Sequence, residues 1–151
     1  MKKLLLLASV LMVLFACNKD KFQSTPQIKI KSISGSVIPA GSGSLTVTLS
    51  FTDKEGDVDD SIFIRKVRIN QRTVPSTLRD TFGYAIPHFP AHSTGDISVY
   101  LEYNSLASAE NPPSVPGGGH ESDSLKIWFK VKDEAGNKSD SVSTGTIVVL
   151  R

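Results

Sequence analysis

Residues 45–52 read Leu-Thr-Val-Thr-Leu-Ser-Phe-Thr, an unbroken alternation of apolar and hydroxyl-bearing side chains. Successive side chains of a β-strand point to opposite faces, so this stretch predicts a strand with one buried and one solvated face. Threonine, valine and phenylalanine are also residues that favour strands. The segment therefore predicts a sheet that packs its apolar face against a second layer.

The same period of two continues on both sides of this segment, and no helical stripe competes with it. Further strands are expected at 28–33, 62–69, 79–86, 97–103, 125–131 and 141–150. About seven short strands separated by turn signals predict an all-β fold, an immunoglobulin-like (Ig-like) antiparallel β-sandwich over residues 28–151. The stretch 104–124 is rich in Pro, Gly and Ser and predicts a long, mobile loop.

The charge balance argues against a nucleic-acid partner. The chain has 17 basic and 15 acidic residues, and two of the basic ones are Lys2 and Lys3. Without these two the charges balance, whereas nucleic-acid binding needs a clustered positive face. The densest basic run, Arg65, Lys66 and Arg68, is expected to be a solvated strand face.

The N-terminus has the form of an export signal. A positive start at residues 1–3 precedes a thirteen-residue, predominantly apolar run, 4–16, which is shorter than a membrane span of about 20 residues. Leu14-Phe15-Ala16-Cys17 resembles the bacterial lipobox, and Cys17 is the only cysteine of the chain. We therefore expect a lipoprotein signal peptide at 1–16, with the acylated Cys17 and a flexible tether at 17–27. The alternative is an ordinary secretory signal followed by a chance cysteine.

The residue after the cysteine bears on the location. In lipoproteins of the enteric type, Asp at this position retains the protein at the inner membrane, and this chain has Asn18. The resemblance implies a lipid anchor in the cell outer membrane and leaves the periplasmic and surface faces open. Several acyl chains together give stable membrane attachment.

An acidic loop follows the opening strand. Residues 53–60 read Asp-Lys-Glu-Gly-Asp-Val-Asp-Asp, with five carboxylates in eight positions. Alternate carboxylates and a glycine for the sharp turn are suited to wrapping oxygen ligands around Ca²⁺. The alternative is a solvated acidic turn whose carboxylates accept local backbone N–H groups. The candidate ligands are Asp53, Glu55, Asp57, Asp59 and Asp60.

Strand direction relates this loop to another one. If the strands alternate in direction, loop 53–60 shares one pole of the sandwich with the loop 133–137 (Asp-Glu-Ala-Gly-Asn) and with the N-terminal tether. The second loop also offers oxygen ligands. A calcium site at this pole is the expectation, by analogy of fold.

Several segments carry a family resemblance. Residues 49–58 (Leu-Ser-Phe-Thr-Asp-Lys-Glu-Gly-Asp-Val), 84–90, 94–97 and 131–139 resemble a group of Bacteroidetes lipoproteins with an Ig-like domain and an F-T-D-x-D-G-D type of acidic turn. Glu55 stands where those proteins more often have Asp. The resemblance implies the fold and the envelope location, and it implies no activity.

Three Asp-Ser-apolar triplets resemble the O-glycosylation sequon of the same bacterial group. Their serines are Ser61, Ser124 and Ser141. The alternative is that Asp-Ser is a common way to open a strand. The triplets therefore mark possible glycosylation sites only.

The remaining candidates do not assemble into a catalytic set. Prolines around His88 and His92 prevent the helical spacing of a zinc site, so both are expected to be loop residues. Trp128 and Tyr100 are expected to face away from the core, where aromatic rings can stack on a sugar or pack across strands.

The sequence thus predicts a non-enzymatic, lipid-anchored envelope module that is structural, adhesive or ligand-binding. Calcium is its expected ion, and an envelope protein or a glycan is its expected partner. The alternative is an outer-membrane accessory lipoprotein that binds carbohydrate or peptide through Trp128 and the stretch 104–124.

Overall fold

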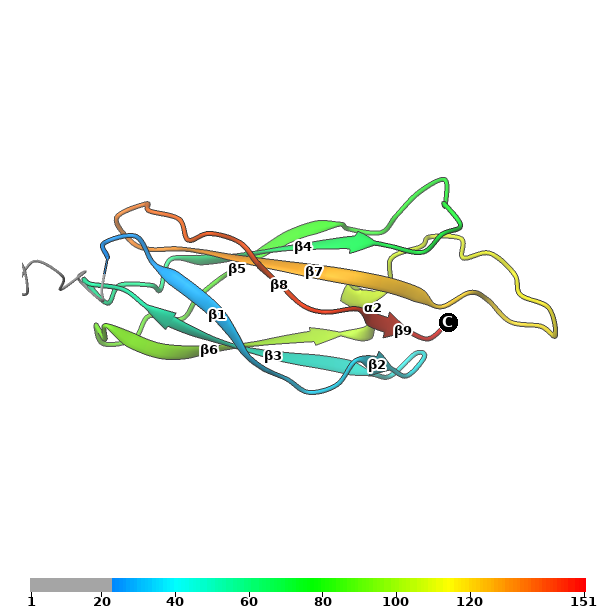
Figure 1. The fold of residues 1–151 in the computed structure, drawn as a ribbon, viewed down its shortest axis with the longest axis horizontal. Coiled ribbons are helices and arrows are strands. Elements are labelled where there is room, and N and C mark those ends of the chain that lie inside the picture. The colour runs from blue at the N-terminus through cyan, green and yellow to red at the C-terminus, as the bar shows by residue number, and fades with distance from the viewer. Residues whose placement is uncertain (1–22) are drawn as a thin grey trace, which may run out of the picture.

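The computed structural model describes residues 23–151, which form two β-sheets packed face to face (Figure 1). The predicted leader, Cys17 and most of the tether lie outside the described residues. One sheet has the order β1 (Gln27–Ile33), β3 (Ser44–Thr52), β6 (Thr94–Glu102). The other has the order β2 (Val37–Ile38), β9 (Ile147–Val149), β7 (Asp123–Lys132), β4 (Ser61–Arg68), β5 (Thr81–Ala85), and β8 (Val142–Ser143) pairs with β7. This arrangement confirms the all-β sandwich.

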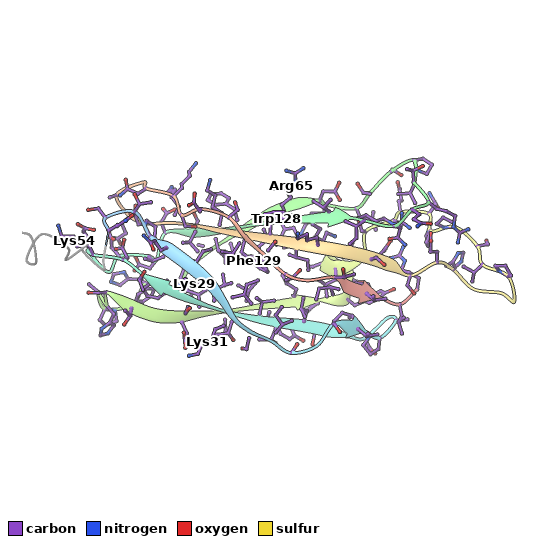
Figure 2. All side chains as sticks on the ribbon, in the orientation of Figure 1. Lys29, Lys31, Lys54, Arg65, Trp128 and Phe129 are labelled. Carbon is purple, nitrogen blue, oxygen red and sulfur yellow. The ribbon has the colours of Figure 1, made fainter. Side chains whose placement is uncertain are left out.

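The core lies between β3 and β7, because both strands alternate as the sequence predicts. Leu45 and Leu49 of β3 are fully buried, and so is Phe129 of β7. Figure 2 shows Phe129 pointing between the sheets, while Trp128 and Arg65 point away from the partner sheet. The outward orientation of Trp128 is thus confirmed.

The last predicted strand, 141–150, is interrupted. It forms β8 and β9, with residues 144–146 between them. The Thr144 hydroxyl oxygen accepts the N–H of Ile127 at 3.1 Å, and the Thr144 N–H donates to the Ile127 carbonyl at 2.9 Å. A side-chain oxygen thus takes the place of a backbone carbonyl, and the strand bends without leaving Ile127 unpaired.

Other strand limits also differ from the prediction. β2 lies between the predicted strands 28–33 and 45–52, where no strand is expected, and its Ile38 is buried and pairs in parallel with Val149 of β9. The chain therefore crosses from one sheet to the other after β1. The strand expected at 79–86 begins at Thr81, because Arg79 has a φ of 39°, outside the extended region.

The stretch 104–124 is held against the sandwich, so the prediction of a mobile loop is wrong for its first half. The short helix α2 (Tyr103–Leu106) follows β6 directly and places Leu106 in the core. Ala109 is buried and forms a β-bridge with Thr77. Apolar side chains within this Pro/Gly-rich stretch provide the burial that anchors it.

The basic run is also not a solvated face. Arg65 is exposed, but Lys66 is only 2% exposed. Its ammonium group donates to the carbonyls of Leu78 at 3.0 Å, Leu106 at 3.5 Å and Ala107 at 2.9 Å. Burial lowers the pKa of Lys66 from 10.5 to about 8. The prediction fails because Lys66 has the same strand parity as the buried Ile62 and Ile64.

A buried ion-pair network lies beside Lys66. Arg68 Nε donates to Asp123 Oδ1 at 2.8 Å, and Arg68 Nη2 donates to Glu121 at 3.0 Å. Asp123 is fully buried and also accepts the N–H groups of Ser108 and Ala109. We call this end of the molecule the opposite pole, because the described chain begins at the other end. It is formed by residues 66–80, 103–123 and 149–151.

Candidate metal centre at the acidic pole

Three loops meet at the other end of the sandwich, where the described chain begins (Figure 1). We call this end the acidic pole and define it by residues 53–60, 86–93 and 133–137. The loops are joined by backbone hydrogen bonds between Asp53 N and Ser93 O (2.9 Å), His92 N and Gly56 O (3.1 Å), and Glu134 N and Asp57 O (3.1 Å). The expectation that loops 53–60 and 133–137 share a pole is confirmed.

Gly56 makes the first loop possible. Its φ is +77°, a conformation that other residues rarely adopt, and a Cβ there would lie 2.6 Å from the backbone nitrogen of His92. The Gly56 N–H also donates to Asp53 Oδ2 at 2.7 Å. The glycine therefore lets the loop turn sharply and bring Asp57 back towards Asp53.

The carboxylates of Asp53, Asp57 and Asp133 form one cluster. One oxygen of each lies within 4.8 Å of the others. Asp53 is fully buried and Asp133 is 1% exposed. Oδ1 of Asp53 and Oδ1 of Asp57 are buried and accept no hydrogen bond within the described part of the chain. Burying such oxygens without a partner is costly, so a ligand that satisfies them would stabilise the cluster.

The charge of this cluster is also uncompensated. Within residues 23–151 no ion pair reaches any of the three carboxylates. Burial raises the pKa of Asp53 above its ordinary value, and the neighbouring Asp57 carboxylate raises it further. A divalent cation would remove both the repulsion and the missing contacts. Carboxylate oxygens are the type of ligand that Ca²⁺ takes.

Asp133 accepts two hydrogen bonds from its own loop, one on each carboxylate oxygen, whereas Asp53 accepts one from Gly56. The Asn137 N–H donates to Asp133 Oδ1 at 2.6 Å, and the Asn137 side-chain amide donates to Oδ2 at 2.9 Å. These bonds fix the carboxylate beside Asp53 and Asp57. Residues 133–137 were expected only to offer oxygen ligands near the site, without Asp133 being chosen among them.

A signal for this choice exists in the sequence. Asp53 continues the buried parity of Leu45, Val47, Leu49 and Phe51, and Asp133 likewise continues that of Leu125, Ile127, Phe129 and Val131. Extending the strand period one step past each strand end therefore places both carboxylates on the inward face.

The other predicted ligands lie outside the cluster. Glu55 Oε1 accepts a hydrogen bond from the Ser24 hydroxyl at 3.2 Å. Asp60 pairs with Lys132 at 2.9 Å, and hydrogen bonds from Ser61 and Lys132 lower the pKa of Asp60. Asp59 is buried and faces His88. Of the five predicted ligands, only Asp53 and Asp57 belong to this cluster, and the other three make contacts outside it.

Trp128 and Tyr100 do not share a site. Trp128 borders a hollow of about 350 Å³ on the outer face of the β7-containing sheet, with Phe63, Arg65 and Lys130. Tyr100 is 61% exposed, as expected for an outward-facing residue, and lines a second hollow of about 370 Å³ between the edge strands β5 and β6.

The three candidate glycosylation serines have different surroundings. Ser61 is half-buried and donates to Asp60. Ser124 lies in β7, and its N–H is bonded to the side chain of Asn70. Ser141 is exposed, and so is the preceding Asp140. Of the three serines, only Ser141 is an exposed residue.

Comparison with known proteins does not place the chain in a family. No protein-family model matches it, and no curated protein shows significant sequence similarity to it. Across residues 23–151, no helix has the length and apolar character needed to span a bilayer.

Proposed function

We propose that this protein is a non-catalytic, lipid-anchored module of the bacterial outer membrane whose β-sandwich is stabilised by Ca²⁺ at the acidic pole. Its role is structural, adhesive or ligand-binding. The observation that carries the calcium part is the cluster of Asp53, Asp57 and Asp133, with two buried carboxylate oxygens that accept no hydrogen bond within the described residues. The anchor at Cys17 rests on the lipobox-like sequence.

An ion in this cluster would also hold the N-terminal segment of the described chain, because that segment is bonded to the same loops. Lys54 N donates to Gln23 O at 3.0 Å, the Ser24 hydroxyl donates to Glu55, and the Asn137 side-chain amide donates to Ser24 O at 3.2 Å. The chain that leads towards Cys17 is therefore bonded to both loops of the cluster. A cation that joins these loops would therefore also fix the position at which the tether meets the sandwich.

Melting of the full chain in detergent tests the calcium site. Binding at a calcium concentration of 100 times Kd stabilises a protein by about 2.7 kcal/mol, so we expect 1 mM Ca²⁺ to raise Tm by about 5 °C or more relative to a chelator. Mg²⁺ should have a smaller effect, because its small octahedral shell fits poorly among three fixed carboxylates.

Matched variants sharpen this test. Asp53→Asn should remove the response to calcium, whereas Glu55→Gln and Asp60→Asn should retain it, because these two carboxylates lie outside the cluster. An unchanged Tm with and without calcium would refute the site. So would an equal response of wild type and Asp53→Asn.

The anchor requires its own experiment. Mass spectrometry of protein from the native host should find diacylglycerol on Cys17 and no leader. Cys17→Ser should release the protein from the membrane fraction. A bare thiol on the mature protein would remove the membrane part of the proposal and leave the calcium part standing.

A second candidate function is binding of an anionic carbohydrate at the hollow beside Trp128. The favouring observation is that Arg65 and Lys130 line this hollow and form no ion pair within residues 23–151, while Lys126 lies over the Trp128 ring at 5.2 Å. Aromatic faces stack on sugars, and cations pair with their acidic groups. Loss of acidic-glycan binding in Trp128→Ala but not in Tyr100→Ala supports it, and no binding to an acidic-glycan array by wild type excludes it.

A further inference from the structure

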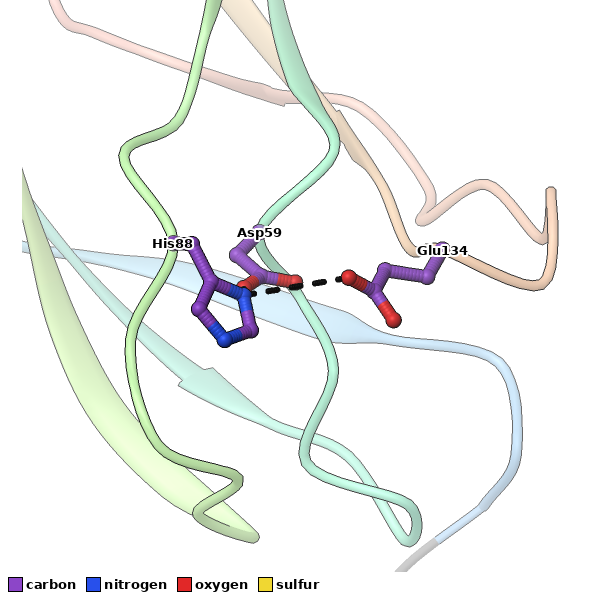
Figure 3. A group of neighbouring side chains, drawn as sticks. All are labelled: Asp59, His88 and Glu134. Carbon is purple, nitrogen blue, oxygen red and sulfur yellow. Dashed lines mark ion pairs between the residues drawn. The ribbon is translucent and has the colours of Figure 1, made fainter.

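A second group of metal-type ligands lies beside the calcium cluster and shares no residue with it. Asp59, His88 and Glu134 come from the three loops of the acidic pole (Figure 3). His88 Nδ1 lies 2.6 Å from Asp59 Oδ2 and 3.8 Å from Glu134 Oε1. One donor atom of each residue lies within 4.8 Å of the others. The geometry brings one imidazole and two carboxylates to a single point.

The buried member of this group has an unused oxygen. The Asp59 side chain is only 2% exposed, and its Oδ1 accepts no hydrogen bond within the described residues. Its Oδ2 accepts the Phe89 N–H at 3.3 Å and contacts His88. In Figure 3 one carboxylate oxygen of Asp59 lies against the imidazole and the other points to the Glu134 side. A simple Asp–His pair explains the first oxygen and leaves the second unexplained.

We propose that Asp59, His88 and Glu134 bind a divalent transition-metal ion, with Zn²⁺ as the best-matched ion. An imidazole nitrogen suits zinc and its neighbours in the transition series, whereas Ca²⁺ takes oxygen ligands. Three protein ligands leave a fourth tetrahedral position, which a water molecule or a side chain of a binding partner can fill.

The change needed for binding is small. Tetrahedral ligands at about 2.1 Å from zinc lie about 3.4 Å apart, so the contact of His88 Nδ1 with Asp59 must lengthen from 2.6 Å. His88 and Glu134 are 81% and 59% exposed, and both can move to allow this, while the buried Asp59 stays fixed. Coordination through Nδ1 requires the neutral imidazole with its proton on Nε2.

The site is coupled to the calcium cluster through its loops. Asp59 follows Asp57 by two residues, and Glu134 follows Asp133 directly. The bond from Glu134 N to Asp57 O joins the two loops at this point. Zinc affinity should therefore rise when calcium orders these loops. Because no ligand is shared, either proposal can fail without the other.

Calorimetric titration of the full chain in detergent with ZnCl₂, at 1 mM CaCl₂, tests the inference. We expect one site in wild type. Loss of an outer-shell partner already weakens metal binding by about 10–100-fold, so His88→Ala and Glu134→Gln should weaken it at least about 100-fold. His92→Ala, in the same loop, and Glu55→Gln are the matched controls and should keep wild-type affinity. Circular dichroism and Tm establish that each variant is folded.

Co²⁺ in place of Zn²⁺ gives a second readout. Wild type and His92→Ala should show visible ligand-field absorption that His88→Ala lacks. Zinc affinity unchanged in His88→Ala would overturn the inference, and so would no zinc binding below 100 µM in wild type. If Asp53→Asn abolished zinc binding and His88→Ala did not, the ion would occupy the calcium cluster and the inference would also fall.

Discussion

Both poles of the sandwich bury charged side chains, but within residues 23–151 only the acidic pole leaves buried carboxylate oxygens without a hydrogen-bond partner. At the opposite pole, the carboxylate of Asp123 contacts Arg68 and two backbone N–H groups, and the ammonium of Lys66 contacts three carbonyls. At the acidic pole, Asp53 Oδ1 accepts no hydrogen bond within residues 23–151. The difference suggests that protein groups complete the first set of charges and that a cation completes the second.

The largest effect is expected from Asp123→Asn. Removing one partner of a buried ion pair leaves the other charge uncompensated and typically costs about 3–5 kcal/mol of unfolding free energy. Here Arg68, whose side chain is 6% exposed, loses its fully buried partner and keeps the partly exposed Glu121 as a counter-charge. Glu121→Gln is the control, because that carboxylate is 21% exposed, and we expect a loss of about 1 kcal/mol or less. Urea denaturation measures the unfolding free energy of both variants. Equal losses would contradict the expectation that the more deeply buried carboxylate matters more.

The second prediction concerns Lys66. Lys66→Met leaves three carbonyls without their donor and should cost about 1–3 kcal/mol at pH 7. A pH series adds a distinctive readout. Because folding lowers the pKa of Lys66 from 10.5 to about 8, the unfolded chain binds more protons between these values. Wild type should therefore gain stability relative to Lys66→Met as pH rises from 8 to 10.5. A flat difference over this range would contradict the burial of a charged ammonium.

These buried charges show which features of the structure the sequence could predict and which it could not. The alternation in 45–52 predicts β3 and its buried face, because the period of two is a direct consequence of strand geometry. The same period places Lys66 inward within the strand 62–69 and, one step past the ends of β3 and β7, also places Asp53 and Asp133 inward. A charge in the sequence nevertheless looks like a surface residue, since it is buried only when distant groups compensate it.

Other features depend on contacts that do not change the alternation of apolar and polar residues along the sequence. Thr144 interrupts the last strand because its hydroxyl oxygen pairs with Ile127, and a threonine at this point does not disturb the alternation. The contact of Asp59 with His88 joins two loops, and only the sheet topology brings them together. Spacing along the chain could therefore predict an acidic calcium loop but not how five carboxylates would be divided.

The third prediction is that removing the buried carboxylate of Asp53 at the acidic pole does not destabilise the protein, in contrast to Asp123→Asn at the opposite pole. In calcium-free buffer, Asp53→Asn removes a buried charge that is not compensated within the described residues. We expect unfolding free energy to stay constant or to rise by about 1 kcal/mol, because the desolvation cost and the repulsion from Asp57 disappear. Asp133→Asn is the matched control within the cluster. It should cost about 1 kcal/mol, because Asp133 accepts two hydrogen bonds from Asn137. A large loss in Asp53→Asn would show that protein groups already satisfy this carboxylate.

The smallest effect is expected at an exposed surface pair that belongs to neither pole. Lys31 of β1 and Asp96 of β6 form an ion pair whose side chains are 57% and 42% exposed. Asp96→Asn should change unfolding free energy by less than about 0.5 kcal/mol, because water already solvates both charges. Salt should reduce even this difference, since exposed charges are screened within about 10 Å at 0.1 M. Urea denaturation at low and high salt measures it. If Asp96→Asn cost as much as Asp123→Asn, burial would not be what separates the strong pairs from the weak ones. The argument that unpartnered buried carboxylates require a cation would then lose its energetic basis.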